Sequence, residues 1–163
     1  ELTSLEHLEL KRCEGTRSIL LKAMLSGGLM LKKLTLVVTE KSDSYVAQFL
    51  AWLAQFTKLE ELSLLLVGSH IVFPLSAVLL HAQALQRLVL DSRTEIQDPT
   101  TIIRYTIADL KQITKSCPLL WALRISLHLE APSPEGTRRG PRRTDTLKVI
   151  KPACDLRILY LRG

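Results

Sequence analysis

One leucine pattern recurs along the whole chain and constrains its fold more than any other feature. In the middle of the chain the phrase Leu-x-x-Leu-x-Leu is formed by Leu59, Leu62 and Leu64, and five similar copies flank it. The middle residues of the six copies stand at positions 8, 34, 62, 88, 123 and 159. Side chains alternate between the two faces of a strand, so each phrase predicts a short strand with its leucines on one face.

The spacing of the copies predicts how these strands are connected. Successive middle residues are 26, 28, 26, 35 and 36 positions apart, which leaves room for one helix after each strand and for insertions in the two longer steps. One such unit cannot bury its own apolar face, so neighbouring units stack and share a core. Pattern and spacing together are typical of leucine-rich repeats. The sequence thus predicts an α/β fold, a leucine-rich-repeat solenoid with a curved parallel sheet on its concave side and helices on its convex side.

The same pattern predicts the domain organisation. We expect residues 1–163 to form a leucine-rich-repeat domain fragment of about six repeats. Insertions are predicted near 93–105 and 131–146, and the fifth strand is predicted over 120–129. The chain begins inside one repeat and ends directly after another, whereas solenoids usually end in polar capping repeats. We therefore expect it to be a piece of a longer protein.

Helical periodicity between the strands supports this organisation. The spacing of apolar residues predicts helices over 17–26 and 43–56. A third helix is predicted to begin near Pro74, since proline suits a first helical turn. A fourth is predicted to run from Thr106 and to end before the pair Cys117-Pro118.

Composition and charge narrow the classes of partner. A hydrophobic content of 47% with only 5% aromatic residues suits a solenoid built from leucine. The formal net charge is +6, but residues 131–155 alone hold six basic and three acidic residues, and no aromatic residue lies among them. Such a cluster is weak support for a nucleic-acid partner, which we regard as unlikely. The cluster includes four arginines, Arg138, Arg139, Arg142 and Arg143. Its composition favours a solvated insertion, and a localisation signal or an anion-binding patch are the alternatives.

Cysteine usage and hydropathy bear on the compartment. The three cysteines, Cys13, Cys117 and Cys154, are well separated and form no Cys-x-x-Cys motif, which favours a reducing compartment and a cytoplasmic or nuclear location. Residues 62–86 include no Lys, Arg, Asp or Glu, and such a run is long enough to span a bilayer. Polar residues and a proline interrupt it, however, and the repeat accounts for its leucines, so no membrane association is predicted.

No arrangement of residues predicts catalysis. The four histidines, His7, His70, His81 and His128, are scattered and match no metal-ligand spacing. The chain has no nucleophile elbow, phosphate-binding loop or dinucleotide motif. Cys117 stands at a predicted helix end and is expected to be a buried structural thiol. We therefore expect no catalytic residue, no metal, no cofactor and no enzymatic activity.

Outward-facing strand positions are the candidates for binding. The residues that alternate with the leucines combine charges of both signs with apolar and aromatic groups, which is typical of a surface that recognises a protein. Arginine and tyrosine are frequent hot-spot residues. Replacing Arg124 and Tyr160 together by alanine is therefore predicted to abolish binding with little change in melting temperature. The candidate contacts come from the fourth to sixth strands: Arg87, Val89, Asp91, Arg124, Ser126, Tyr160 and Arg162.

One repeat resembles a known family. Residues 107–125 hold a predicted helix that ends in Cys117-Pro118 and leads directly into the next leucine phrase, and this arrangement resembles the repeat of F-box leucine-rich-repeat proteins. The long steps between residues 88 and 159 look like the loose repeats of fungal F-box-like proteins. The resemblance implies substrate recognition by an F-box-type ubiquitin-ligase adaptor, with a protein substrate as partner.

A second family is also similar. Residues 2–10 and 156–163 look like strand phrases of plant disease-resistance receptors, so a recognition domain of such a receptor is the alternative function. Those receptors mostly have shorter, strand-dominated repeats. The predicted helix over 43–56 favours the F-box family.

Overall fold

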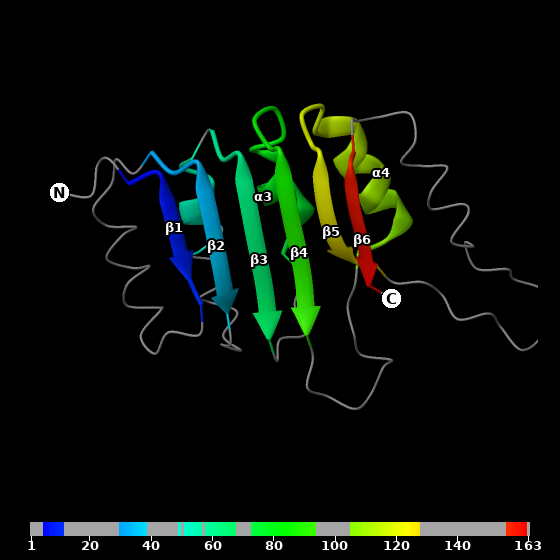
Figure 1. Ribbon diagram of the computed structural model, residues 1–163, viewed down its shortest axis with the longest axis horizontal. Coiled ribbons are helices and arrows are strands. Elements are labelled where there is room, and N and C mark those ends of the chain that lie inside the picture. The colour runs from blue at the N-terminus through cyan, green and yellow to red at the C-terminus, as the bar shows by residue number, and fades with distance from the viewer. Residues whose placement is uncertain are drawn as a thin grey trace, which may run out of the picture.

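The computed structural model describes residues 5–11, 30–38, 49, 51–56, 58–67, 73–93, 105–127 and 156–162. These residues form an α/β fold with one open sheet of six parallel strands in the order β1-β2-β3-β4-β5-β6 (Figure 1). The strands are β1 (His7–Leu10), β2 (Lys33–Val38), β3 (Glu61–Val67), β4 (Arg87–Arg93), β5 (Ala122–Ser126) and β6 (Ile158–Arg162). Helix α3 (Leu75–Leu79) follows β3, and helix α4 (Ile107–Ser116) follows β4. The prediction of parallel strands at the six leucine phrases is confirmed.

The repeated phrase also explains the register of the sheet. Each strand pairs in parallel with the next strand along the chain, and the middle leucine of each phrase lies opposite that of its neighbour. A shift by one residue would turn every buried leucine to the other face, so a shared phrase favours one register. The paired residues form one row across the sheet: Leu8, Leu34, Leu62, Leu88, Leu123 and Leu159.

The segments that lead into the strands are joined by a repeated pattern of backbone hydrogen bonds. The N–H of Glu60 donates to the carbonyl of Lys32 at 2.8 Å, and the N–H of Gln86 donates to the carbonyl of Glu60 at 2.7 Å. The same step recurs from Trp121 to Gln86 at 2.9 Å and from Arg157 to Trp121 at 2.8 Å. These bonds pair backbone polar groups outside the strands and tie each unit to the preceding one.

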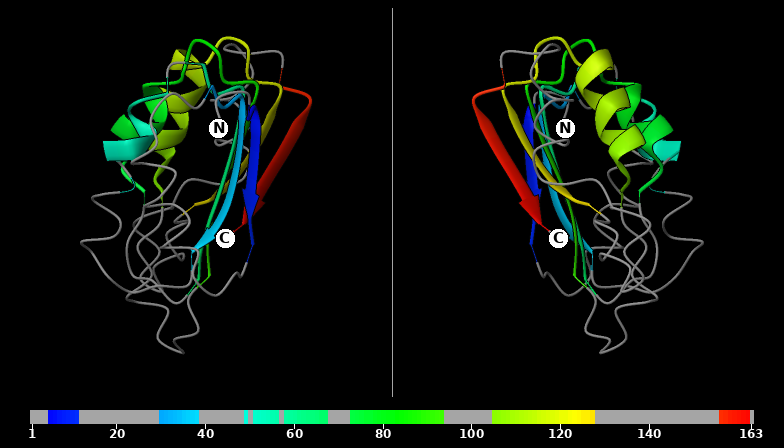
Figure 2. Two further views of the ribbon diagram at one scale, coloured as in Figure 1. Left: turned by 90° about the vertical axis from the view of Figure 1, so that its left-hand side faces the viewer. Right: turned by 90° about the vertical axis from the view of Figure 1, so that its right-hand side faces the viewer.

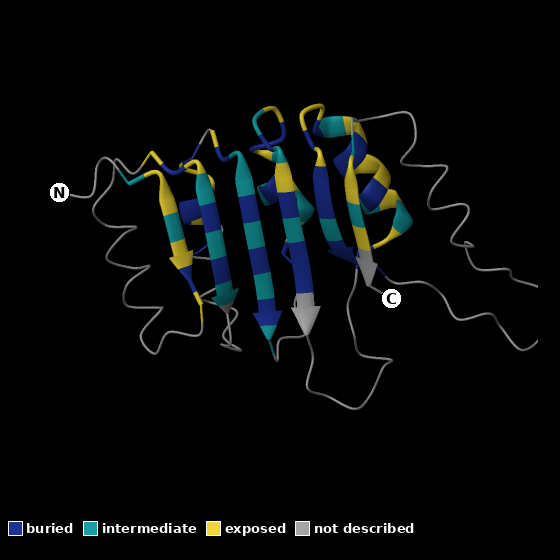
Figure 3. Ribbon diagram, in the orientation of Figure 1, coloured by how far each residue is buried: buried dark blue, intermediate teal, exposed yellow. Residues whose placement is uncertain are grey.

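The hydrophobic core lies between the sheet and the helices. Figure 2 shows α3 and α4 on the same side of the sheet. Along β3, buried residues alternate with partly exposed ones, as Figure 3 shows, and Leu62 and Leu64 on the helix side are fully buried. Val78 of α3 and Leu110 of α4 are buried in the same core. We call the opposite side of the sheet, away from α3 and α4, the open face.

Helix α4 begins and ends where the sequence predicts. Thr106 is its N-cap residue, and the Thr106 hydroxyl accepts a hydrogen bond from the backbone N–H of Asp109 at 3.2 Å. The Asp109 carboxylate accepts one in return from the backbone N–H of Thr106 at 2.7 Å, which completes a capping box. At the other end, the N–H of Cys117 donates to the Ile113 carbonyl at 3.0 Å. Cys117 is fully buried, which confirms the expectation of a buried thiol.

The fifth strand and the other predicted helices need separate comment. The strand begins at Ala122 rather than at 120, because the N–H of Leu120 bonds to the Cys117 carbonyl in the turn before it. It ends at Ser126, and residues 128–129 of the predicted range lie outside the described residues. Of the helix predicted over 43–56, residues 49 and 51–53 are described and helical. The helix predicted over 17–26 lies outside the described residues.

Both ends of the insertion predicted near 93–105 belong to the folded structure. Arg93 is the last residue of β4, and Tyr105 is buried against the core. The Tyr105 hydroxyl donates to the backbone carbonyl of Phe73 at 2.9 Å, which explains why a polar group can be buried there. The insertion predicted near 131–146 lies outside the described residues.

The charge-free run over residues 62–86 is divided between different elements. Its described residues include most of β3 and all of α3. In the described part of the chain, no helix is long and apolar enough to cross a membrane.

Candidate functional site

The register of the sheet arranges the outward side chains in rows across the open face. Side chains two residues apart on one strand share a face, so each row repeats one position of the leucine phrase. One row runs through His7, Lys33, Glu61, Arg87, Ala122 and Ile158. The next row runs through Glu9, Thr35, Ser63, Val89, Arg124 and Tyr160.

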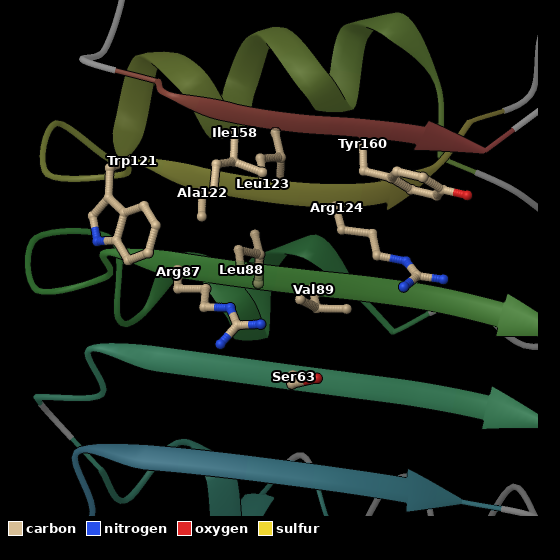
Figure 4. Close-up of a pocket in the computed structure, with 10 residues that line it drawn as sticks. All are labelled: Ser63, Arg87, Leu88, Val89, Trp121, Ala122, Leu123, Arg124, Ile158 and Tyr160. Atoms are coloured by element: carbon tan, nitrogen blue, oxygen red, sulfur yellow. The ribbon is translucent and has the colours of Figure 1, made fainter.

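A hollow with a volume of about 540 Å³ lies on the open face over β4, β5 and β6. Figure 4 shows Trp121 and Arg87 at one end of it and Arg124 and Tyr160 at the other. Smaller side chains, including that of Val89, lie between these ends. Four of the predicted contact residues therefore line one hollow: Arg87, Val89, Arg124 and Tyr160.

Two of the predicted contact residues, Asp91 and Ser126, are buried in the structure. Each residue is only 6% exposed, so neither offers much surface to a partner. The Ser126 hydroxyl donates to Asp91 Oδ1 at 2.8 Å, and Arg124 Nη2 donates to Asp91 Oδ2 at 2.8 Å. Asp91 and Ser126 lie on the neighbouring strands β4 and β5. Ser126 bonds to Asp91, and Asp91 in turn bonds to Arg124 and holds its side chain in place. Arg162 is part of β6, but its side chain lies outside the described residues.

Arg124 is held from two sides. Its guanidinium carbon lies 4.8 Å from the centroid of the Tyr160 ring, within the range of a cation–π contact. The Arg124 side chain is 37% exposed, whereas that of its partner Asp91 is 3% exposed. A side chain that is already fixed in place loses less conformational entropy on binding. Arg124 is thus positioned to contact a ligand while it remains partly accessible.

The ion pair with Asp91 means that a substitution of Arg124 affects the stability of the fold as well as the surface. An alanine at this position would leave a buried carboxylate without its guanidinium partner, and unpaired buried charges are destabilising. Because of this pair, we now expect truncation of Arg124 to lower the melting temperature, in place of the small change expected from the sequence. Tyr160 is more than half exposed and stays suitable for that experiment.

The part of the open face over β1–β3 is charged. Glu61 accepts a hydrogen bond from Lys33 Nζ at 2.5 Å, and its second oxygen lies 3.6 Å from Arg87 Nη1. The hydrogen bond from Lys33 is the main cause that holds the pKa of Glu61 below its ordinary value, and the nearby Arg87 charge acts in the same direction. Glu9 and Lys11 form a further ion pair on β1 and the residue after it.

Large exposed apolar side chains gather on β6 and in the segment that leads into β5. Four of the six large hydrophobic residues that are exposed in the described structure lie there, and they are between 36% and 55% exposed. A second hollow of about 470 Å³ shares the lining residues Trp121 and Ile158 with the first, so the two hollows are neighbours. The four residues are Leu119, Trp121, Ile158 and Tyr160.

Trp121 was not among the predicted contacts, although the sequence carries a signal for it. It occupies a variable position of the phrase that begins at Leu120, directly before β5. An aromatic residue at such a position is not needed for the core and points to the surface. The strand alternation does not reach it, because Trp121 precedes the first strand residue, Ala122.

The other ionisable or nucleophilic groups do not join this site. His81 is buried on the helix side, and burial holds the pKa of its imidazole below the ordinary value, against a smaller opposite effect of the Leu53 backbone. Burial likewise raises the pKa of Tyr105. Among the described residues, no group of three or more His, Cys, Asp or Glu side chains could hold a metal ion.

Comparisons of the chain with protein-family models, with curated proteins and with solved structures found no match.

Proposed function

We propose that this chain is a leucine-rich-repeat module that binds a protein partner on the open face of its sheet and catalyses no reaction. The observation that carries the proposal is the hollow between Trp121, Arg87, Arg124 and Tyr160. Exposed aromatic residues and arginines beside one another are the residue types that dominate the binding energy of protein interfaces. A repeated leucine phrase with one parallel strand per repeat supports the leucine-rich-repeat assignment.

The more specific part of the proposal is substrate recognition by an F-box-type ubiquitin-ligase adaptor in the cytoplasm or nucleus. It is supported by the resemblance of one repeat, in which helix α4 ends at Ser116, Cys117-Pro118 follows and β5 begins at Ala122. In this proposal the bound protein is the substrate of the ligase, and the open face selects it.

The binding face is tested by a capture experiment with the whole chain. Arg87 and Tyr160 are replaced together by alanine, and proteins retained from a lysate of the source cells are quantified by mass spectrometry. Both side chains are about half exposed, so the melting temperature should change little. A hot-spot residue is worth about 2 kcal/mol or more, which is about thirtyfold in affinity, so the double variant should bind a specific partner at least that much more weakly.

Two controls make the result specific. Lys111→Ala removes an exposed side chain from α4, on the helix side of the sheet, and should leave capture intact. The second control changes four arginines to serine in the segment outside the described residues: Arg138, Arg139, Arg142 and Arg143. If this variant loses the partner and the Arg87/Tyr160 variant keeps it, the open face is not the binding face.

The ligase assignment has an independent test in the gene. The coding sequence upstream of Glu1 should encode an F-box, and the full-length protein should co-purify with the ubiquitin-ligase subunit that binds F-boxes. A nucleotide-binding P-loop module upstream would instead support the plant receptor and would overturn the ligase assignment.

A further inference from the structure

The lining of the hollow over β4–β6 has a definite chemical character, which limits what it can bind. We propose that this hollow binds a partner segment that presents an aspartate or glutamate carboxylate within two residues of a large apolar side chain. The inference rests on the proposed protein-binding function and adds the chemistry of the bound segment.

Two arginines give the hollow its positive charge. Arg87 and Arg124 both line it, and no acidic residue is among its described lining residues. The side chain of Arg87 is half exposed, and its Nη1 lies 3.6 Å from Glu61, beyond ordinary hydrogen-bond distance. A guanidinium carries five N–H donors in a planar fork that matches a carboxylate, so this loose contact leaves donors for a ligand.

Nearby carboxylates limit that positive charge. Glu61 lies between Lys33 and Arg87, and Asp91 pairs with Arg124. Among these five described residues, three cations therefore face two anions. A carboxylate adds one negative charge, whereas a phosphate monoester adds about −1.5 to −2 at neutral pH. The single excess positive charge of this group complements a carboxylate better than a phosphate.

Apolar side chains flank the arginines. In Figure 4, Trp121 lies beside Arg87, and Ile158 and Tyr160 follow along β6. The register places Arg87 opposite Ala122, whose small side chain leaves space next to the Trp121 indole. A carboxylate held by Arg87 therefore brings a neighbouring apolar side chain of the same segment over Ala122. Contact there removes exposed apolar surface from water, which favours binding.

The test uses a phage-displayed library of short random peptides, selected against the whole 163-residue chain. Selected peptides should carry Asp or Glu within two residues of Trp, Phe or Leu. Synthetic peptides are then measured by calorimetry. Arg87→Gln should weaken their binding roughly tenfold or more, because a hydrogen bond to a charged group is lost. Exchange of the peptide's carboxylate for the amide should have a similar effect, and exchange for phosphoserine should not strengthen binding.

Matched variants separate the site from general electrostatics. Lys111→Gln removes one positive charge on the helix side and should leave the affinity unchanged. Arg124→Lys keeps a cation beside the buried Asp91, so we expect this variant to fold. It can therefore be used to test the contribution of the second arginine. The proposal is overturned if selection yields no peptide that depends on Arg87, if the peptides lack acidic residues, or if phosphoserine peptides bind more tightly.

The outcome also distinguishes this inference from the proposed function. Peptides without acidic residues that lose affinity on Trp121→Ala would overturn the carboxylate preference and leave the open face as a protein-binding surface. The proposed function itself fails only if protein capture is independent of the open face.

Discussion

Asp91 is a buried charge whose hydrogen bonds also fix a side chain that lines the hollow. Its side chain is 3% exposed, and its two oxygens accept hydrogen bonds from Arg124 and Ser126, each at 2.8 Å. Removing a carboxylate from water is unfavourable unless other polar groups replace the water. The two donors do so here, and the same bonds position the Arg124 guanidinium at the hollow. A single buried carboxylate thus holds Arg124 in place at the hollow that we propose as the binding surface.

Replacing Asp91 by asparagine should lower the free energy of unfolding. The amide nitrogen would face a hydrogen-bond donor where the carboxylate now accepts, so one donor is left without a partner. The expected loss is about 1–3 kcal/mol, measured by urea denaturation, with the lower part of the range favoured because Arg124 is partly exposed.

Glu61→Gln provides the comparison, because the pair of Glu61 and Lys33 lies on the same sheet but is more exposed. Exposed ion pairs contribute less than about 1 kcal/mol. An equal loss of stability in both variants would contradict the view that burial of Asp91 sets its contribution.

At the scale of elements, helix α4 is the best-defined helix of the described structure. Its capping box is visible in the sequence as Thr106-Ile107-Ala108-Asp109, a Thr followed three positions later by an acidic residue. The reciprocal bonds between Thr106 and Asp109 satisfy two backbone N–H groups that a helix start leaves unpaired. The helix carries Leu110 and Ile113 into the hydrophobic core on the side of the sheet away from the open face, so the cap supports that core.

Thr106→Ala should therefore destabilise the protein by about 0.5–2 kcal/mol, the usual effect of losing an N-cap side chain. Thermal or urea denaturation followed by circular dichroism measures the change. Lys111→Ala, at an exposed position of the same helix, should stay within about 0.5 kcal/mol of the parent. A Thr106 variant as stable as the Lys111 variant would show that α4 is held by its packing alone.

At the scale of the whole molecule, the leucine phrase was sufficient to predict six parallel strands and their order, because periodicity and register are local properties repeated along the chain. How deeply a side chain is buried, by contrast, depends on residues that are distant in the sequence. Alternation assigns Asp91 to the open face, but its burial depends on Arg124 and Ser126, which lie 33 and 35 positions away. The exposed apolar patch is non-local for the same reason, since Trp121 and Ile158 meet only when β5 and β6 pair.

The last prediction concerns how the core is shared along the sheet. Leu62 lies in the middle of the leucine row and is fully buried, so Leu62→Ala should cost about 2–5 kcal/mol in urea denaturation. Leu8 occupies the same position of the phrase on β1 but is only partly buried, and the same substitution there should cost less than half as much. Both changes remove the same atoms, so the difference measures packing rather than chemistry. Equal losses of unfolding free energy at Leu62 and Leu8 would contradict the view that the leucine row packs more densely at its centre than at its end.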